Sequence, residues 1–71
     1  MDKKAFGQRI KSHRKAAGLG QRDVAAALGI SLTMVSFYEC GRNVPTLDRF
    51  TRLCDVIDCR PDDLLVTISS A

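Results

Sequence analysis

Apolar residues at helical spacing are the feature of this sequence that most restricts its fold. They recur three or four positions apart along the chain, and no segment alternates apolar and polar residues for long enough to predict a strand. Glycines at positions where helices would end, and hydroxyl residues where helices would begin, divide this pattern into five segments. The sequence therefore predicts an all-α fold, a compact bundle of five helices.

The segment boundaries follow from these capping residues. The first helix lies between Asp2 and Gly18, the second covers about residues 21–28, and the third covers 32–40 between Ser31 and Gly41. The fourth follows Thr46, and Pro61 fits the first position of a short fifth helix. The residues expected to face the core are Phe6, Ile10, His13, Ala17, Val24, Ala25, Leu28, Val35, Tyr38, Leu47, Phe50, Leu53, Cys54 and Ile57.

The length of 71 residues allows one domain with a small core and little room for an enclosed pocket, which favours a function at the surface. No apolar run approaches the roughly 18 residues of a membrane span, and the N-terminus lacks the apolar core of a signal peptide, so we expect a cytoplasmic protein.

We expect the domain to cover residues 1–66. Residues 67–71 form a short tail that either frays or adds an edge to a second subunit. With no further domain after the fifth helix, we expect no small-molecule ligand.

Charge is distributed unevenly along the chain. Residues 1–22 carry seven Lys and Arg residues against one Asp, whereas residues 23–45 and 46–71 have net charges of −1 and −2. A basic first helix is consistent with an ordinary solvated face. It is equally consistent with attraction to the phosphates of a nucleic acid.

The third helix has an unusual outer surface. A helical projection turns Val35 and Tyr38 inward. The outward residues are Thr33, Ser36, Phe37 and Cys40, flanked by Leu32 and Met34. Hydroxyl and apolar groups together suit the DNA major groove, where hydroxyls bond to base edges and apolar groups touch thymine methyls. The same mixture also suits a protein partner, because an exposed Phe with apolar neighbours forms a contact patch.

The stretch "GQRDVAAALGISLTMVSFYECGRNVPTLDRF" resembles the helix-turn-helix of the phage-repressor family, the Cro/C1 or XRE type of DNA-binding regulator. The matching positions are Gln21, Ala25, Gly29, Val35, Glu39, Gly41 and Pro45, and the resemblance extends over roughly residues 6–65. It implies a lambda-repressor-like fold whose second and third helices form the motif. It also implies that the third helix lies in the major groove of double-stranded DNA and that a homodimer binds two half-sites.

The resemblance also implies roles for individual residues. The residues expected to read bases are Leu32, Thr33, Ser36 and Phe37, and those expected to contact phosphates are Gln21, Arg22, Arg42 and Asn43. Arg14 and Glu39 are expected to form an ion pair between the first and third helices, although the residues alone also allow an exposed pair of little energetic value. Three positions depart from the family pattern. Gly20 stands where Ser or Thr normally caps the second helix, and Cys40 stands where a polar residue often helps to hold the backbone. Asp58 replaces the usual glycine after the fourth helix.

Other functions have weaker support in the sequence. His13 is the only histidine and lies on an apolar stripe, so we expect no catalysis. The three cysteines lack the Cys-x₂-Cys spacing of a zinc site, and we expect no metal and no cofactor. The serious alternative is a protein-interaction module on the same fold. We predict a sequence-specific transcriptional regulator, a repressor-type protein that binds operator DNA as a homodimer.

Overall fold

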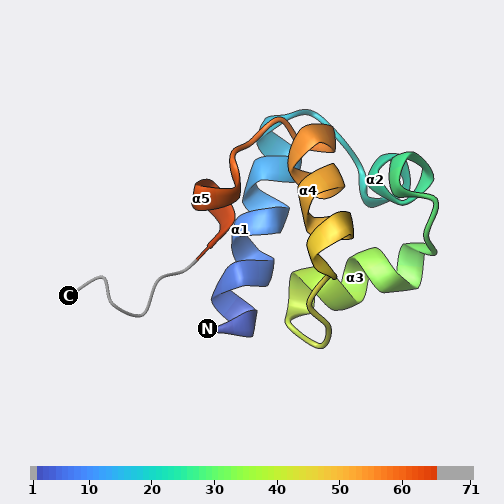
Figure 1. Ribbon diagram of the computed structural model, residues 1–71. Coiled ribbons are helices and arrows are strands. Elements are labelled where there is room, and N and C mark those ends of the chain that lie inside the picture. The colour runs from blue at the N-terminus through green and yellow to red at the C-terminus, as the bar shows by residue number, and fades with distance from the viewer. Residues whose placement is uncertain (1, 66–71) are drawn as a thin grey trace.

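The computed structural model describes residues 2–65, which form five helices and their connecting loops (Figure 1). The helices are α1 (Lys3–Ala16), α2 (Gln21–Leu28), α3 (Leu32–Cys40), α4 (Leu47–Val56) and α5 (Pro61–Leu64). The predicted all-α fold is therefore confirmed. The tail predicted at residues 67–71, and its boundary at residue 66, lie outside the described residues.

Helix α3 packs against both α1 and α2, and α2 also packs against α4 (Figure 1). The axes of α2 and α3 turn by 113° at the break between them. Helices α1 and α4 meet through their aromatic side chains, since the ring centroids of Phe6 and Phe50 are 5.7 Å apart, and α5 packs against both helices. The buried apolar core consists of Phe6, Ile10, Val24, Ala25, Leu28, Val35, Tyr38, Leu53, Cys54, Ile57 and Leu64.

The capping residues predicted from the sequence lie at the starts of α1, α3 and α4 and form hydrogen bonds there. The Asp2 carboxylate accepts hydrogen bonds from the N–H groups of Lys4 and Ala5, both at 3.1 Å. The Ser31 hydroxyl accepts one from Met34 at 3.1 Å, and Thr46 caps α4 in the same way. These contacts satisfy backbone donors that have no partner within their own helix.

Two of the departures from the family pattern have local consequences. Gly20 has no side chain to cap α2, but its own N–H donates to the Asp23 carboxylate at 2.7 Å. Asp58 adopts a φ of 55° after α4, the only non-glycine residue with positive φ among those described. Short polar side chains tolerate this conformation better than other residues do, and glycine tolerates it best.

The predicted inner face of α1 is partly wrong. The sequence assigns His13 and Ala17 to the core, but His13 is half-buried and Ala17 is exposed. Arg14 is buried instead, because a carboxylate on α3 pairs with it. Leu47 is also wrongly assigned to the core. It is the first residue of α4, lies at the rim of the protein and is 80% exposed.

Gly7 allows α1 and α3 to approach closely, a contact that the sequence pattern does not predict. A Cβ atom at this position would overlap the carbonyl oxygens of Tyr38 and Glu39, which are backbone atoms of α3. Without a side chain at residue 7, the first half of α1 can lie directly on the C-terminal half of α3. The crossing thus places α3 relative to the rest of the core.

No single helix among residues 2–65 is long and apolar enough to cross a membrane. Taken together, the bent pair of α2 and α3 is long and apolar enough, by length and composition alone.

The Gly7 crossing leads to a prediction about stability. Alanine favours a helix over glycine by about 0.5–1 kcal/mol, so Gly7→Ala would stabilise α1 if only helix propensity mattered. We expect instead a fall of about 1–3 kcal/mol in the free energy of unfolding, because the added methyl overpacks the crossing. Urea denaturation followed by circular dichroism measures this change. Exposed Gln8→Ala, the next residue in α1, is the matched control, and equal stability of the two variants would contradict the crossing.

Candidate nucleic-acid interface

Helix α3 presents the residues predicted to read DNA on its outer surface. Thr33 and Ser36 are exposed, Leu32 is 40% exposed, and Phe37 is half-buried. We call these four residues the reading face. Val35 and Tyr38 are buried on the opposite side of the helix, as helical spacing predicted. Phe37, which was assigned outward, is only partly exposed, and Glu39 is buried as well.

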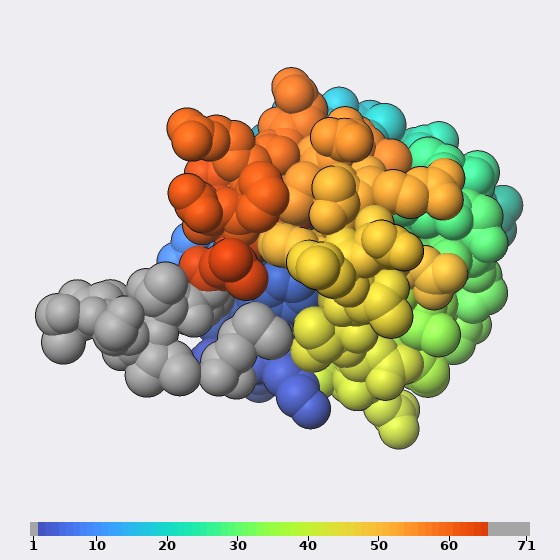
Figure 2. Space-filling view, viewed as in Figure 1, coloured from blue at the N-terminus to red at the C-terminus, as the bar shows by residue number. Residues whose placement is uncertain are grey.

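The surface of α3 is continuous with that of its neighbours. In the space-filling view, the green and yellow-green atoms of α2, α3 and the loop after α3 follow one side of the molecule (Figure 2). The two helices of the motif and the loop therefore share one surface.

A buried ion pair fixes the C-terminal half of α3. The Arg14 Nε atom donates to Glu39 Oε2 at 2.6 Å, and Arg14 Nη2 donates to Glu39 Oε1 at 3.1 Å. The two side chains are only 8% and 5% exposed. Bidentate pairs of this kind combine charge with a fixed geometry, so the contact holds α1 and α3 in one relative orientation.

Further hydrogen bonds connect the ion pair to the start of α2. Arg14 Nη1 donates to the Leu19 carbonyl oxygen at 2.9 Å, and Gln21 Nε2 donates to Glu39 Oε1 at 3.0 Å. No buried side-chain nitrogen or oxygen among the described residues lacks a partner. A fully satisfied network of this kind offsets much of the cost of burying two charges.

Gln21 and Arg22 occupy the first turn of α2. Gln21 is half-buried and its amide already bonds to Glu39, whereas the Arg22 side chain is exposed. The N–H groups of a first helical turn have no partner within the helix, and the helix dipole there favours an anion. This turn can therefore offer backbone donors and one free guanidinium to a phosphate.

The loop after α3 folds back onto the helix. The N–H groups of Arg42 and Asn43 both donate to the Phe37 carbonyl oxygen, at 2.9 and 3.3 Å. The Asn43 side-chain amide lies 3.5 Å from the Met34 sulfur. Both loop residues predicted to contact phosphate thus lie against the recognition motif, and both are exposed.

A family model described as "Helix-turn-helix domain" matches residues 5–66. The chain belongs to the helix-turn-helix family of DNA-binding transcription regulators, in its Cro/C1 branch. It is 33% identical over 64 residues to the uncharacterized HTH-type transcriptional regulator YazB of Bacillus subtilis, an alignment covering 90% of this chain and 93% of YazB.

Two further similarities extend this finding. The cryptic phage CTXphi transcriptional repressor RstR of Vibrio cholerae is 33% identical over 57 residues, 80% of this chain. The chain spans about half of RstR, since the aligned region is 51% of that protein. The restriction-modification controller protein C.AhdI of Aeromonas hydrophila superimposes with a TM-score of 0.83 and 31% identity, over 90% of this chain and 97% of C.AhdI.

Lys3 and Lys4 lie near the helix-turn-helix, although no sequence motif assigned them to it. The backbone of Gly41 lies against the first turn of α1, and a Cβ on Gly41 would be 2.9 Å from the Lys4 Cα atom. Lys3 and Lys4 are both exposed and therefore lie next to the turn that precedes Arg42. Only the excess of positive charge in residues 1–22 indicated them in advance.

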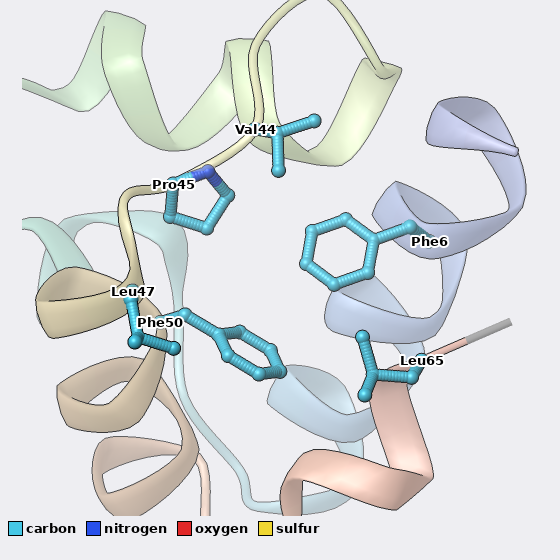
Figure 3. A pocket seen from close by; sticks show the side chains of 6 residues that line it. All are labelled: Phe6, Val44, Pro45, Leu47, Phe50 and Leu65. Carbon is cyan, nitrogen blue, oxygen red and sulfur yellow. The ribbon is translucent and has the colours of Figure 1, made fainter. Parts of the chain in front are cut away.

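An apolar groove lies at the start of α4 and the end of α5. It has a volume of about 210 Å³ and is lined by Phe6, Val44, Pro45, Leu47, Phe50 and Leu65 (Figure 3). Four large apolar residues are exposed among those described, and three of them, Val44, Leu47 and Leu65, line this groove. The fourth is Leu32 on the reading face.

The cysteines do not form a metal centre with other residues in the described part of the chain, where no group of three His, Cys, Asp or Glu side chains converges. Cys54 is buried and Cys59 half-buried at the end of α4. Burial raises the pKa of the Cys54 thiol, and burial together with the neighbouring Cys54 raises the pKa of Cys59 to about 12. Both groups therefore remain thiols near neutral pH. Cys40 is exposed on α3.

The ion pair gives a second prediction about stability. Glu39→Gln leaves the Arg14 charge buried without a counter-charge, and we expect the free energy of unfolding to fall by about 3 kcal/mol. The double variant Arg14→Met/Glu39→Leu removes both charges and should lose less, since an apolar pair can replace a buried ion pair. Urea denaturation compares both with Asp55→Asn, an exposed control with the same acid-to-amide change. Equal losses in the single and double variants would show that the two charges are not coupled.

Proposed function

We propose that this chain represses transcription by binding operator half-sites in double-stranded DNA as a homodimer, with α3 in the major groove. The reading face carries the proposal, because it mixes exposed hydroxyl and apolar groups on a helix whose opposite side is held by the core and by the Glu39 ion pair. The similarity to RstR, a transcriptional repressor, supports repression. The Cro/C1 branch supports the docking geometry.

The reading face divides between two kinds of base contact. The hydroxyl groups of Thr33 and Ser36 can donate to or accept from base edges. Leu32 and Phe37 suit the methyl groups of thymine. Because none of these four side chains can make the two hydrogen bonds with which Arg or Asn recognises a base, we propose modest base specificity that depends on the shape of the apolar contacts.

Phosphate contacts flank the reading face on both sides. Gln21 and Arg22 supply the first turn of α2, and Arg42 and Asn43 supply the loop after α3. Helix N-termini, amides and guanidinium groups are common phosphate ligands and fix the register of a protein on the duplex. Lys3 and Lys4 add positive charge beside the second of these segments.

The size of the module and the apolar groove support homodimerisation. One module of this type buries only about 600–1,000 Å² on DNA, and two half-sites one helical turn apart multiply the affinity. A two-fold interface needs a patch that fits itself. The groove region combines a hollow with a protruding Leu47, so we propose that Leu47 of each copy occupies the groove of the other.

We propose that the protein acts in the cytoplasm, without catalysis and without a metal, cofactor, small-molecule ligand or membrane. Its relatives YazB and RstR are described as transcriptional regulators, which supports a role without catalysis. We propose residues 1–66 as the DNA-binding domain and residues 67–71 as a short tail. The family match to residues 5–66 supports this division.

Selection of bound duplexes from a random library tests DNA recognition. We expect a two-fold symmetric winner whose affinity falls steeply with salt, because phosphate contacts release counterions. Arg22→Ala should weaken binding to every sequence alike and lower the salt slope by about 1. Thr33→Ala should instead change which base is preferred at one position of each half-site. The two variants control for each other, since each alters one kind of contact.

The selection also decides between DNA and a protein partner. No enrichment of any duplex, with only weak and salt-insensitive retention, would contradict DNA recognition. It would favour a protein-interaction module in which Phe37 and Leu32 form the contact patch.

Sedimentation equilibrium tests the dimer. We expect Leu47→Ser to shift the protein toward monomer and to weaken binding to a two-half-site duplex much more than to a single half-site. Leu47 is 80% exposed in one chain, so its loss should leave the stability of the monomer almost unchanged. Asp55→Ser, also exposed on α4, is the control. A wild-type protein that sediments only as a monomer, with and without DNA, would rule out the proposed dimer.

A further inference from the structure

The end of α3 holds Arg42 in a fixed place relative to Phe37. Gly41 reverses the chain with a φ of 84°, and the Arg42 N–H then donates to the Phe37 carbonyl oxygen at 2.9 Å. Because the Gly41 backbone also lies against Lys4 of α1, the turn is supported on its other side. The backbone of Arg42 therefore has little freedom to move away from the helix.

The Arg42 side chain returns over the aromatic ring. Its guanidinium carbon lies 5.0 Å from the centroid of the Phe37 ring, within the range of a cation–π contact. The ion pair of Arg14 with Glu39 is the only one among residues 2–65, so no carboxylate of the described chain neutralises Arg42. Its N–H groups are free for an anion while the guanidinium lies over the Phe37 ring.

This contact matters because of the composition of the reading face. Phe37 can recognise a thymine methyl only by its position and shape, so discrimination depends on how firmly the ring is held. A planar guanidinium can stack on a ring and bind a phosphate in the plane of its N–H groups at the same time. The ammonium group of lysine has the same charge but no plane with which to cover the ring.

We propose that Arg42 is a positioning residue for base recognition: it holds the Phe37 ring against its base while its N–H groups contact the DNA backbone. This inference rests on the proposed DNA-binding function and adds to it a specificity role for a residue otherwise expected to contact phosphate alone. It makes base recognition by Phe37 depend on a residue outside α3.

Arg42→Lys separates the two roles of Arg42. Duplex selection and affinity against salt should be measured for the wild type, Arg42→Lys, Phe37→Leu and the double variant. We expect Arg42→Lys to keep the salt slope but to lose about 5-fold to 30-fold in discrimination at one base pair, since the lysine ammonium keeps the charge but has no plane with which to hold the ring. In the Phe37→Leu background, Arg42→Lys should cause no further loss at that base pair.

The free protein gives a readout that does not depend on DNA. The Arg42 side-chain protons should show ring-current shifts in the NMR spectrum, and Phe37→Leu should abolish them. Unfolding in urea should be similar for all four proteins, because both side chains lie at the surface or are only half-buried. A variant that fails to fold is replaced by Phe37→Met, which also removes the ring.

Two results would overturn the inference while DNA recognition stands. One is an Arg42→Lys protein with unchanged base preference, and the other is an equal loss of affinity on every sequence, which would leave Arg42 as a phosphate contact only. Absence of the ring-current shifts would also overturn it. If the wild type selects no duplex at all, the proposed function itself fails, and the inference fails with it.

Discussion

The buried ion pair between Arg14 and Glu39 is the contact on which the placement of α3 depends. A helix of nine residues is too short to be stable alone, and only two apolar side chains of α3, Val35 and Tyr38, are fully buried. The pair adds a fixed geometry to this small apolar contact. The free energy lost by burying the two charges offsets much of the free energy gained by pairing them. We therefore infer that the pair mainly orients α3 and adds little net stability.

Gly7 and Gln21 also help to hold α3 in place, one through α1 and the other through α2. The absent side chain at residue 7 brings the α1 backbone against the carbonyl groups of Tyr38 and Glu39, and the Gln21 amide ties Glu39 to the start of α2. The first and second helices therefore hold the same end of α3. A reading face held in this way before DNA arrives loses little conformational entropy on binding, which favours affinity in a small protein.

Much of the fold could be predicted because the signals for it are local. Helical spacing and capping residues such as Ser31 and Gly29 act on neighbours only a few positions away, so they predict the five helices and the break between α2 and α3. The outward direction of Thr33 and Ser36 follows from the same spacing. The roles of individual residues in DNA contact came from the family resemblance, since no local pattern distinguishes a base-reading residue from a solvated one.

The features that helical spacing did not predict depend on residues far apart in the chain. Spacing assigned His13 to the core in place of Arg14, because the Glu39 carboxylate that pairs with Arg14 and allows its burial lies 25 positions away. The close approach at Gly7 and the position of Lys4 beside Gly41 have the same origin. Leu47 was assigned inward by its helical spacing from Phe50 and Leu53. It is the first residue of α4 and is exposed there, because no described helix covers that end of α4. The position of the Arg42 guanidinium over the Phe37 ring requires the reversed turn after α3.

The central claim is that α3 is a preformed reading helix held by the ion pair, and an NMR titration with the selected duplex tests it most directly. We expect the largest shift changes at residues 21–22, 32–37 and 42–43, with the Arg14 Nε–H signal present and nearly unmoved from the free to the bound protein. Shift changes centred on the groove around Phe50 would contradict the claim. Loss of the Arg14 signal on binding would do so as well, because α3 would then reorient to meet DNA.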